Sequence, residues 1–116
     1  MNYLLLICTD ETVQLSPEEQ AAMSRDTEAW VAEMDGRGIR LQGDRLRPVA
    51  DARSVRVRDG ELLVADGPFA ETKEHIAGID LLECSSLAEA IEVASRHPVA
   101  RIGTVEVRAF WGDAEA

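Results

Sequence analysis

Two segments that are apolar on both alternating faces constrain this chain more than any other feature. Asn2 to Cys8 (NYLLLIC) and Ile76 to Cys84 (IAGIDLLEC) lack the strict alternation of a strand with one wet face. Strands of this kind belong where both of their faces are covered. We therefore expect Asn2 to Cys8 to form a central strand of a sheet.

Capping residues at two N-termini predict two helices. Ser16-Pro17-Glu18-Glu19 combines an N-cap serine, a proline at the first helical position and a glutamate at N3. That pattern is a capping box, and Gly36 and Gly38 end the helix that it begins. The second helix begins in the same way at Ser86-Leu87-Ala88-Glu89 and stops before Pro98. The expected buried stripes are Met23, Thr27, Trp30, Val31 and Met34 on the first helix, and Leu87, Ala90, Ile91 and Ala94 on the second.

Further strands are expected over Ile39 to Val49, Ser54 to Arg58, Glu61 to Ala65 and Thr104 to Trp111. Asp59-Gly60 suits a tight hairpin turn between the second and third of these. The resulting order of elements predicts a single domain over residues 1–116 with an α+β fold, close to the ferredoxin-like split βαβ plan with an inserted β-hairpin.

Two helices cover one face of such a sheet and leave the other face open. An exposed, contiguous apolar sheet face usually marks an interface. We therefore predict a homodimer formed through the open sheet face.

The charge of the chain excludes several classes of function. It has 12 basic and 22 acidic residues and a net charge of −10. Such a chain repels phosphate backbones, so we expect no direct binding of nucleic acid. The longest apolar run, Tyr3 to Cys8, is too short for a membrane span or a signal peptide, and we expect a cytoplasmic protein. Cys8 and Cys84 are expected to be buried free thiols.

The basic residues are concentrated in one stretch. Arg37 to Arg58 contains seven arginines and two aspartates. This stretch is suited to holding an anionic ligand or another subunit's acidic helix, but arginines that alternate with apolar residues usually form the wet face of a strand. We favour that structural interpretation.

The chemically richest segment runs from Asp66 to His75 (DGPFAETKEH). It contains Asp66, two glutamates, His75 and Lys73, the chain's only lysine. A carboxylate beside a histidine or lysine can bring a general acid or base close to neutral pH. A solvated charged loop is the alternative explanation, and chemistry alone favours it.

The motif DGPFAETKE, followed by GIDLLECSSLAEAIEVASRHP and GTVEVRAFW, resembles the DGPF subgroup of the YCII-related proteins from Tyr3 to Trp111. The resemblance implies a dimeric α+β barrel in which two sheets pack face to face. It implies no defined reaction, but the wider superfamily includes lactone isomerases, cofactor-free monooxygenases and haem proteins. Related sequences carry an aspartate, suspected of acid–base work, immediately before the proline that ends the second helix. Here His97 occupies that position, so an inherited Asp–His mechanism is in doubt, and His97 is equally suited to the end of a helix.

Two hypotheses follow. The first is an enzyme that acts without a metal on a small organic molecule in a cavity near the DGPF loop, with Asp66, Lys73, His75 and His97 as candidate catalytic residues. The second is a ligand-sensing or partner-binding dimer, and the resemblance implies an association with extracytoplasmic-function sigma factors through the acidic helix from Ser16 to Asp35. No zinc, dinucleotide or phosphate-loop motif occurs, so we expect no cofactor and no metal.

Overall fold

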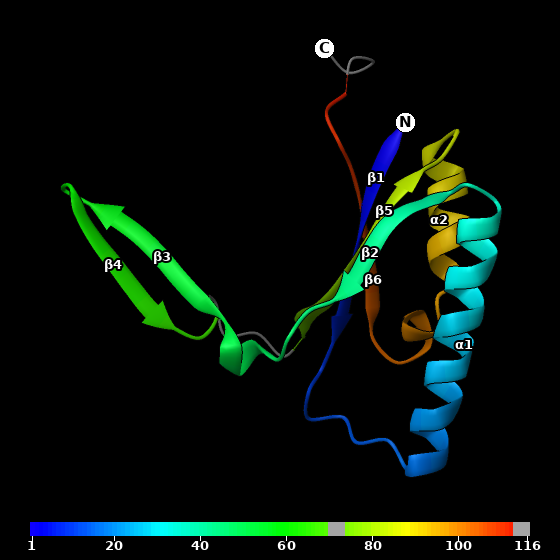
Figure 1. Ribbon diagram of the computed structural model, residues 1–116, viewed down its shortest axis with the longest axis horizontal. Coiled ribbons are helices and arrows are strands. Elements are labelled where there is room, and N and C mark those ends of the chain that lie inside the picture. The colour runs from blue at the N-terminus through cyan, green and yellow to red at the C-terminus, as the bar shows by residue number, and fades with distance from the viewer. Residues whose placement is uncertain (70–73, 113–116) are drawn as a thin grey trace.

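The computed structural model describes residues 1–69 and 74–112, and it is an α+β fold built on one four-stranded sheet (Figure 1). The strands are β1 (Asn2–Thr9), β2 (Arg40–Arg45), β3 (Arg53–Arg58), β4 (Glu61–Asp66), β5 (His75–Glu83) and β6 (Thr104–Ala109). The helices are α1 (Pro17–Gly36) and α2 (Leu87–Ser95), with two short 3-10 helices, η1 (Val49–Asp51) and η2 (Pro98–Arg101).

The sheet has the strand order β2-β5-β1-β6, and every pairing in it is antiparallel. β1 lies between β5 and β6, so the central strand predicted from its two apolar faces is confirmed. The order is that of a ferredoxin-like fold, and β3 and β4 form a separate two-stranded hairpin inserted between β2 and β5. Neither helix of the described chain is long and apolar enough to cross a membrane.

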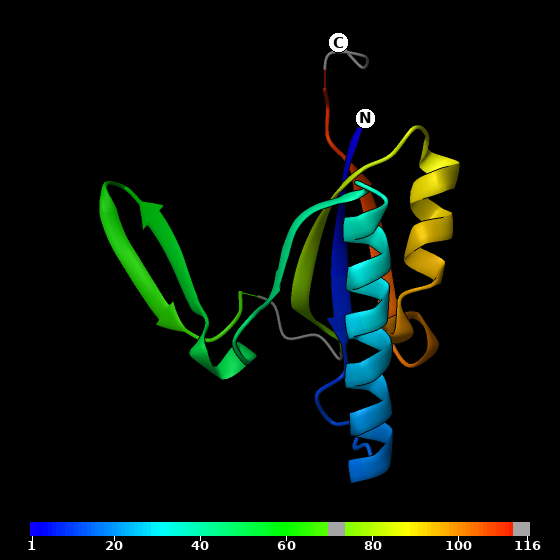
Figure 2. The same ribbon diagram turned by 45° about the vertical axis from the view of Figure 1, so that its right-hand side comes forward.

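Both helices pack on the same face of the sheet, as Figure 2 shows. β1 contributes alternate residues to this core, and the register places Leu82 of β5 opposite Tyr3. The residues of the apolar core are each at most 8% exposed. They are Tyr3, Leu5, Ile7, Trp30, Met34, Ile39, Leu82, Cys84, Ala90, Val93, Ala94 and Val99. The core is therefore confined to the layer between the helices and one sheet face.

α1 begins as the sequence predicts. The Ser16 side chain accepts a hydrogen bond from the Glu19 N–H, and the Glu19 carboxylate accepts one from the Ser16 N–H, which is a complete capping box. Gly38, in the left-handed region at φ +70°, lies just after the helix. Trp30 and Met34 are fully buried, whereas the other predicted stripe residues of α1 are half-buried.

α2 departs from two sequence expectations. Its buried residues are Ala90, Val93 and Ala94, whereas Leu87 and Ile91 are 51% and 53% exposed. Ala90 and Ala94 of the predicted stripe are confirmed, whereas Leu87 and Ile91 were wrong, because the buried face is centred closer to Val93 than the spacing indicated. The Ser86 side chain accepts from the Glu89 N–H, but the Glu89 carboxylate accepts from the Ser85 N–H instead of completing the box at Ser86.

One ion pair is largely enclosed at the edge of the sheet. Arg40 of β2 donates to Asp80 of β5 at 2.7 Å and to Asp35 at the end of α1 at 3.2 Å. Gly43 makes room for this pair, because a Cβ atom built there would lie 2.1 Å from Asp80 Oδ1. Burial raises the pKa of Asp80, and the hydrogen bond from Arg40 opposes that rise.

The opposite face of the sheet carries no helix (Figure 2). The register places an apolar stripe at its centre, with Leu4 and Leu6 of β1 beside Leu81 and Ile79 of β5. Polar residues border the stripe. Glu106 and Arg108 lie opposite Leu6 and Leu4 on β6, and Gln42 and Asp44 lie on β2.

The hairpin β3–β4, which we call the arm, projects away from the sheet on the side opposite the helices (Figure 1). Asp59 and Gly60 at its tip both have positive φ, as the predicted Asp-Gly turn requires. β2 ends at Arg45 and not near Val49 as expected, because the chain leaves the sheet there, passes through η1 and enters the arm. Both strands of the arm are largely exposed.

Candidate functional site

His97 is a buried polar residue at the junction of α2 and η2. The residue is only 4% exposed. Its backbone N–H donates to the Ala94 carbonyl at the end of α2. The imidazole Nδ1 then accepts a hydrogen bond from the Val99 N–H at 3.1 Å and so caps η2. The sequence suggested a place at the C-terminus of the second helix, but α2 ends at Ser95 with Arg96 as its C-cap, and His97 is instead the N-cap of η2.

This cap decides which nitrogen of His97 carries the proton. Because Nδ1 accepts a hydrogen bond, the neutral ring carries its proton on Nε2. Nε2 has no protein partner among the described residues. His97 is one of the residues that line a hollow in the surface, so its ring borders that hollow.

Burial lowers the pKa of His97 from 6.5 to about 4. Desolvation is the cause, since a buried imidazole loses the hydration that stabilises its cation. His97 is therefore neutral at pH 7 and presents Nε2–H as a hydrogen-bond donor. A neutral imidazole held in this way is suited to binding or polarising an oxygen atom, and it is poorly suited to a protonated general acid.

A hollow of about 520 Å³ opens at His97 between α1 and the end of α2. Trp30 forms part of its wall, with its ring edge-on to His97 at a centroid distance of 4.7 Å. The lining comes from both helical regions and consists of Asp26, Ala29, Trp30, Glu33, Ser95, Arg96, His97, Pro98 and Arg101.

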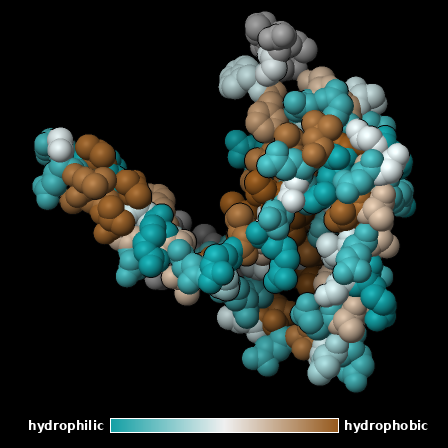
Figure 3. All heavy atoms as spheres, in the orientation of Figure 1, coloured by the Kyte–Doolittle hydropathy of each residue, from teal (hydrophilic) through white to brown (hydrophobic). Residues whose placement is uncertain are grey.

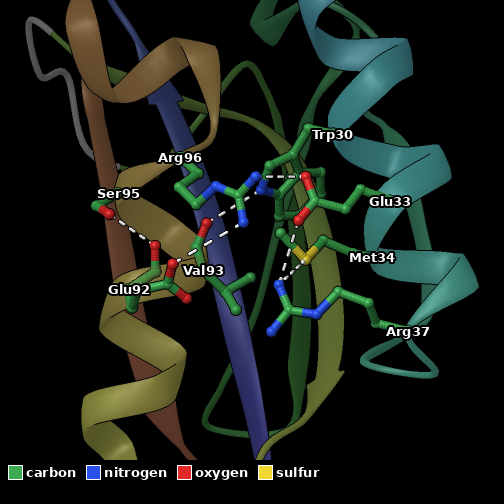
Figure 4. Close-up of polar contacts among 8 residues, drawn as sticks. All are labelled: Trp30, Glu33, Met34, Arg37, Glu92, Val93, Ser95 and Arg96. Atoms are coloured by element: carbon green, nitrogen blue, oxygen red, sulfur yellow. Dashed lines mark hydrogen bonds and ion pairs between the residues drawn. The ribbon is translucent and has the colours of Figure 1, made fainter.

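Ion pairs between the helical segments border this hollow. Glu33 of α1 pairs with Arg96 at the end of α2, as Figure 4 shows, and Asp26 pairs with Arg101 of η2 at 2.9 Å. Hydrogen bonding to Arg96 is the main cause that lowers the pKa of Glu33. Glu33 is consequently an ionised carboxylate at neutral pH, and the hollow combines one neutral donor with a charged border.

Asp66, the first residue of the DGPF segment (Asp66–Phe69), lies at the base of the arm. Its carboxylate pairs with Arg53 across the hairpin at 3.2 Å, and its side chain is 88% exposed. The following Gly67 N–H donates to the Ala52 carbonyl. Asp66 thus forms a cross-strand ion pair in water.

A second hollow, of about 570 Å³, lies where the DGPF segment meets β3. Arg56 lies over the Phe69 ring, 4.6 Å from its centroid. Arg56 and Arg58 have no acidic partner among the described residues. The lining consists of Arg53 to Arg58 with Pro68 and Phe69.

The predicted site residues are distributed over separate places. His75 is the half-buried first residue of β5, opposite Thr9 of β1, and Lys73 lies outside the described residues. No hydrogen bond or ion pair joins Asp66, His75 and His97 to one another in the described chain.

Sequence reasoning missed one polar cluster on the open sheet face. Thr104 of β6 donates to Glu74 at 3.4 Å, beside Cys8 of β1, whose pKa is raised by burial and by Glu106 and Glu74. Cys8 and Cys84 are both free, and only Cys84 is fully buried. No three His, Cys, Asp or Glu side chains gather into a metal-binding group within residues 1–69 and 74–112.

Comparison with known proteins gives two findings. The family model of the YCII-related domain matches residues 1–111. An uncharacterised protein of Rhizobium meliloti (strain 1021), R00369, is 40% identical over 96 residues, which are 81% of this chain and 77% of that protein.

Proposed function

This chain belongs to the YCII-related domain family, and from that premise we propose that it is a homodimer that binds and acts on a small organic molecule in the hollow at His97. The observation that carries the proposal is the position of His97. Its buried ring lines the hollow and is fixed by a hydrogen bond from the Val99 N–H to Nδ1, and Nε2 has no hydrogen-bond partner among the described residues.

The chemistry of the hollow defines the class of ligand. Nε2–H is a donor, so the ligand must present an acceptor, and a carbonyl or carboxylate oxygen fits best. The Trp30 ring offers an apolar wall next to that donor. A ligand with a carboxylate would compete with Glu33 and Asp26 for Arg96 and Arg101, which pair with these two residues at the border.

In a catalytic role, His97 would polarise a bound carbonyl by hydrogen bonding. This is the role that a neutral imidazole with a depressed pKa can perform at pH 7. Aspartate, the residue expected here from the family resemblance, is an acceptor when ionised. A histidine at this position therefore replaces an acceptor by a donor, and the resemblance does not carry an Asp–His mechanism over to this chain.

Titration followed by NMR tests the binding proposal. We would record long-range 1H–15N spectra of both imidazoles while adding benzoate, acetoacetate and γ-butyrolactone as separate probes. The proposal predicts a saturable shift of the His97 Nε2 signal with at least one probe. His97→Asn should abolish binding, followed by the indole N–H signal of Trp30 in the same hollow, while keeping the η2 cap, since its side-chain oxygen can accept from the Val99 N–H, and His75→Asn is the matched control. Equal binding by His97→Asn would refute the assignment.

The homodimer rests on the open sheet face. Leu4, Leu6, Ile79 and Leu81 form an apolar stripe on a face that no helix covers, with charged residues at its margins. Packing against the same face of a second copy buries both stripes and leaves the polar margins exposed to solvent. An apolar centre with a polar rim is usual for a protein–protein interface. Light scattering should give twice the mass of the chain, and Ile79→Lys should give a monomer while Gln42→Lys at the margin should not. A monomeric wild-type protein at 100 µM would contradict the dimer.

A partner-binding module is the second candidate, favoured by the outer surface of α1. Glu18, Glu19, Asp26 and Glu28 are all exposed there. Such a surface steers a basic partner and loses affinity as salt rises. From the family resemblance, the partner to test is an extracytoplasmic-function sigma factor. Charge reversal at Glu18, Glu19 and Glu28 should abolish its capture, and unchanged capture would exclude this surface.

A further inference from the structure

One face of the arm is entirely apolar over its outer part. The register places Val55 opposite Val64 and Val57 opposite Leu62, and opposed residues share a face. All four side chains are more than half exposed, at 63%, 57%, 59% and 64% in that order. Figure 3 shows the same hydrophobic concentration on the outer part of the arm.

The other face of the arm is different in character. It carries Arg56 opposite Leu63 and Arg58 opposite Glu61. The alternation of valine and arginine in β3 therefore produces one apolar and one mostly charged face, as a strand with one covered side requires. Within the described chain, however, β3 and β4 pair only with each other and nothing covers the apolar face.

A freestanding two-stranded hairpin is marginally stable in water unless a further surface packs against it. Exposure of four large aliphatic side chains adds to that cost, because removing apolar surface from water is favourable. The arm also lies at an open angle to the body, on the side of the sheet that carries no helix (Figures 1 and 3). A molecule that packs on the open sheet face therefore lies within the same angle as the arm.

The distribution of charge favours a second copy of this chain as the molecule that packs between the arm and the open sheet face. From Arg53 to Asp66 the arm contains three arginines and three acidic residues, so it is neutral, and the rest of the chain carries the whole net charge of −10. At the base of the apolar face, Arg53 and Asp66 neutralise each other. Two copies that repel each other elsewhere therefore meet without repulsion at the arm.

We propose that the arm is an intermolecular clasp, in which Val55, Val57, Leu62 and Val64 of each protomer pack against the other copy of this chain. The inference rests on the homodimer proposed above and adds a second contact to it, outside the sheet. The clasp couples formation of the dimer to stabilisation of the hairpin.

Adjacent leucines on opposite faces of β4 provide a matched pair of variants. Leu62→Lys places a charge in the proposed contact, and Leu63→Lys places the same charge on the other face. We expect Leu62→Lys to raise the dimer dissociation constant about 10- to 100-fold, the factor that corresponds to the burial of one leucine. Leu63→Lys should change it by no more than about threefold. Equal effects of the two variants would overturn the clasp.

A second measurement uses the unmodified protein and separates the two proposals. In a dimer mixed from isotope-labelled and unlabelled protomers, filtered NOE spectra report only contacts between protomers. The clasp predicts such contacts from the methyl groups of Val57 and Leu62. If the contacts come only from the sheet residues Leu6 and Ile79, the dimer stands and the clasp is wrong. If the protein is a monomer and no contacts occur, both proposals fail.

Discussion

The rings of Trp30 and His97 lie edge to face, with centroids 4.7 Å apart and planes inclined by 66°. The same indole donates its Nε1–H to the Val93 carbonyl of α2 at 3.0 Å. Trp30 therefore joins the two helices and also excludes water from one side of His97. Trp30 thus contributes both to the burial that lowers the pKa of that imidazole and to the packing of the helices.

Trp30→Phe should destabilise the fold by about 2 kcal/mol. The lost hydrogen bond accounts for about 1 kcal/mol, because the Val93 carbonyl keeps a second donor in the Arg96 N–H, and reduced burial accounts for the rest. Urea unfolding followed by circular dichroism measures the change. Trp111→Phe is the control, since Trp111 is 82% exposed and its replacement should cost less than about 0.5 kcal/mol. Equal midpoints for the two variants would contradict this role of Trp30.

His97 should make the stability of the protein depend on pH between about 4 and 6.5. Its folded pKa of about 4 is below the unfolded value of 6.5, so the unfolded chain binds more protons in this range. The free energy of unfolding therefore falls as pH falls from 6.5 toward 4, by as much as about 3 kcal/mol. In His97→Asn this component should be absent, and the difference between the two proteins isolates it from the carboxylates and His75. Parallel pH profiles would show that His97 titrates normally.

Removing one partner of the Arg40–Asp80 pair should lower the free energy of unfolding more than removing one partner of an exposed ion pair. Asp80→Ala leaves the guanidinium of Arg40 largely buried with only Asp35 as its partner, and we expect a cost of about 3 kcal/mol. Arg47→Ala is the control, since its pair with Asp51 is exposed and should contribute less than about 1 kcal/mol. Chemical denaturation of both variants measures the contrast, and a cost below 1 kcal/mol for Asp80→Ala would contradict it.

Gly43 should tolerate no side chain. A Cβ atom there would lie 2.1 Å from Asp80 Oδ1 and 2.8 Å from the backbone oxygen of Ile79, so β2 and β5 would have to separate. Gly43→Ala should therefore lower the melting temperature by several degrees or prevent folding. Gly36→Ala is the control, because no atom lies within 4 Å of its built Cβ. A melting temperature unchanged in Gly43→Ala would show that the strands separate easily there.

Local signals in the sequence predicted most of the fold. The capping box at Ser16, the Asp59-Gly60 turn and the two-faced strand β1 each depend on residues close together in the chain, and all three are confirmed. The sequence also placed Arg56 and Arg58 on the face of β3 opposite Val55 and Val57. It left open what covers the valines, because burial depends on the position of the arm relative to the sheet.

The candidate site was less accessible to sequence reasoning because it depends on contacts between distant segments. His97 was predicted as a candidate, but its tautomer and burial follow from the hydrogen bond that Nδ1 accepts from the Val99 N–H and from packing against Trp30 of α1. Trp30 itself was predicted only as a core residue. Asp66 stood out by its place in an unusual motif, and the cross-strand ion pair with Arg53 follows only from the hairpin register.

The protonation state of His97 tests the account most directly. A long-range 1H–15N spectrum distinguishes the two neutral tautomers of an imidazole from its cation, and it can be recorded from pH 7 down to pH 4. We predict the neutral form with the proton on Nε2 at pH 7, persisting below pH 5 and giving way to the cation near pH 4. A proton on Nδ1, or a cation already formed at pH 6, would contradict the donor role on which the proposed site rests.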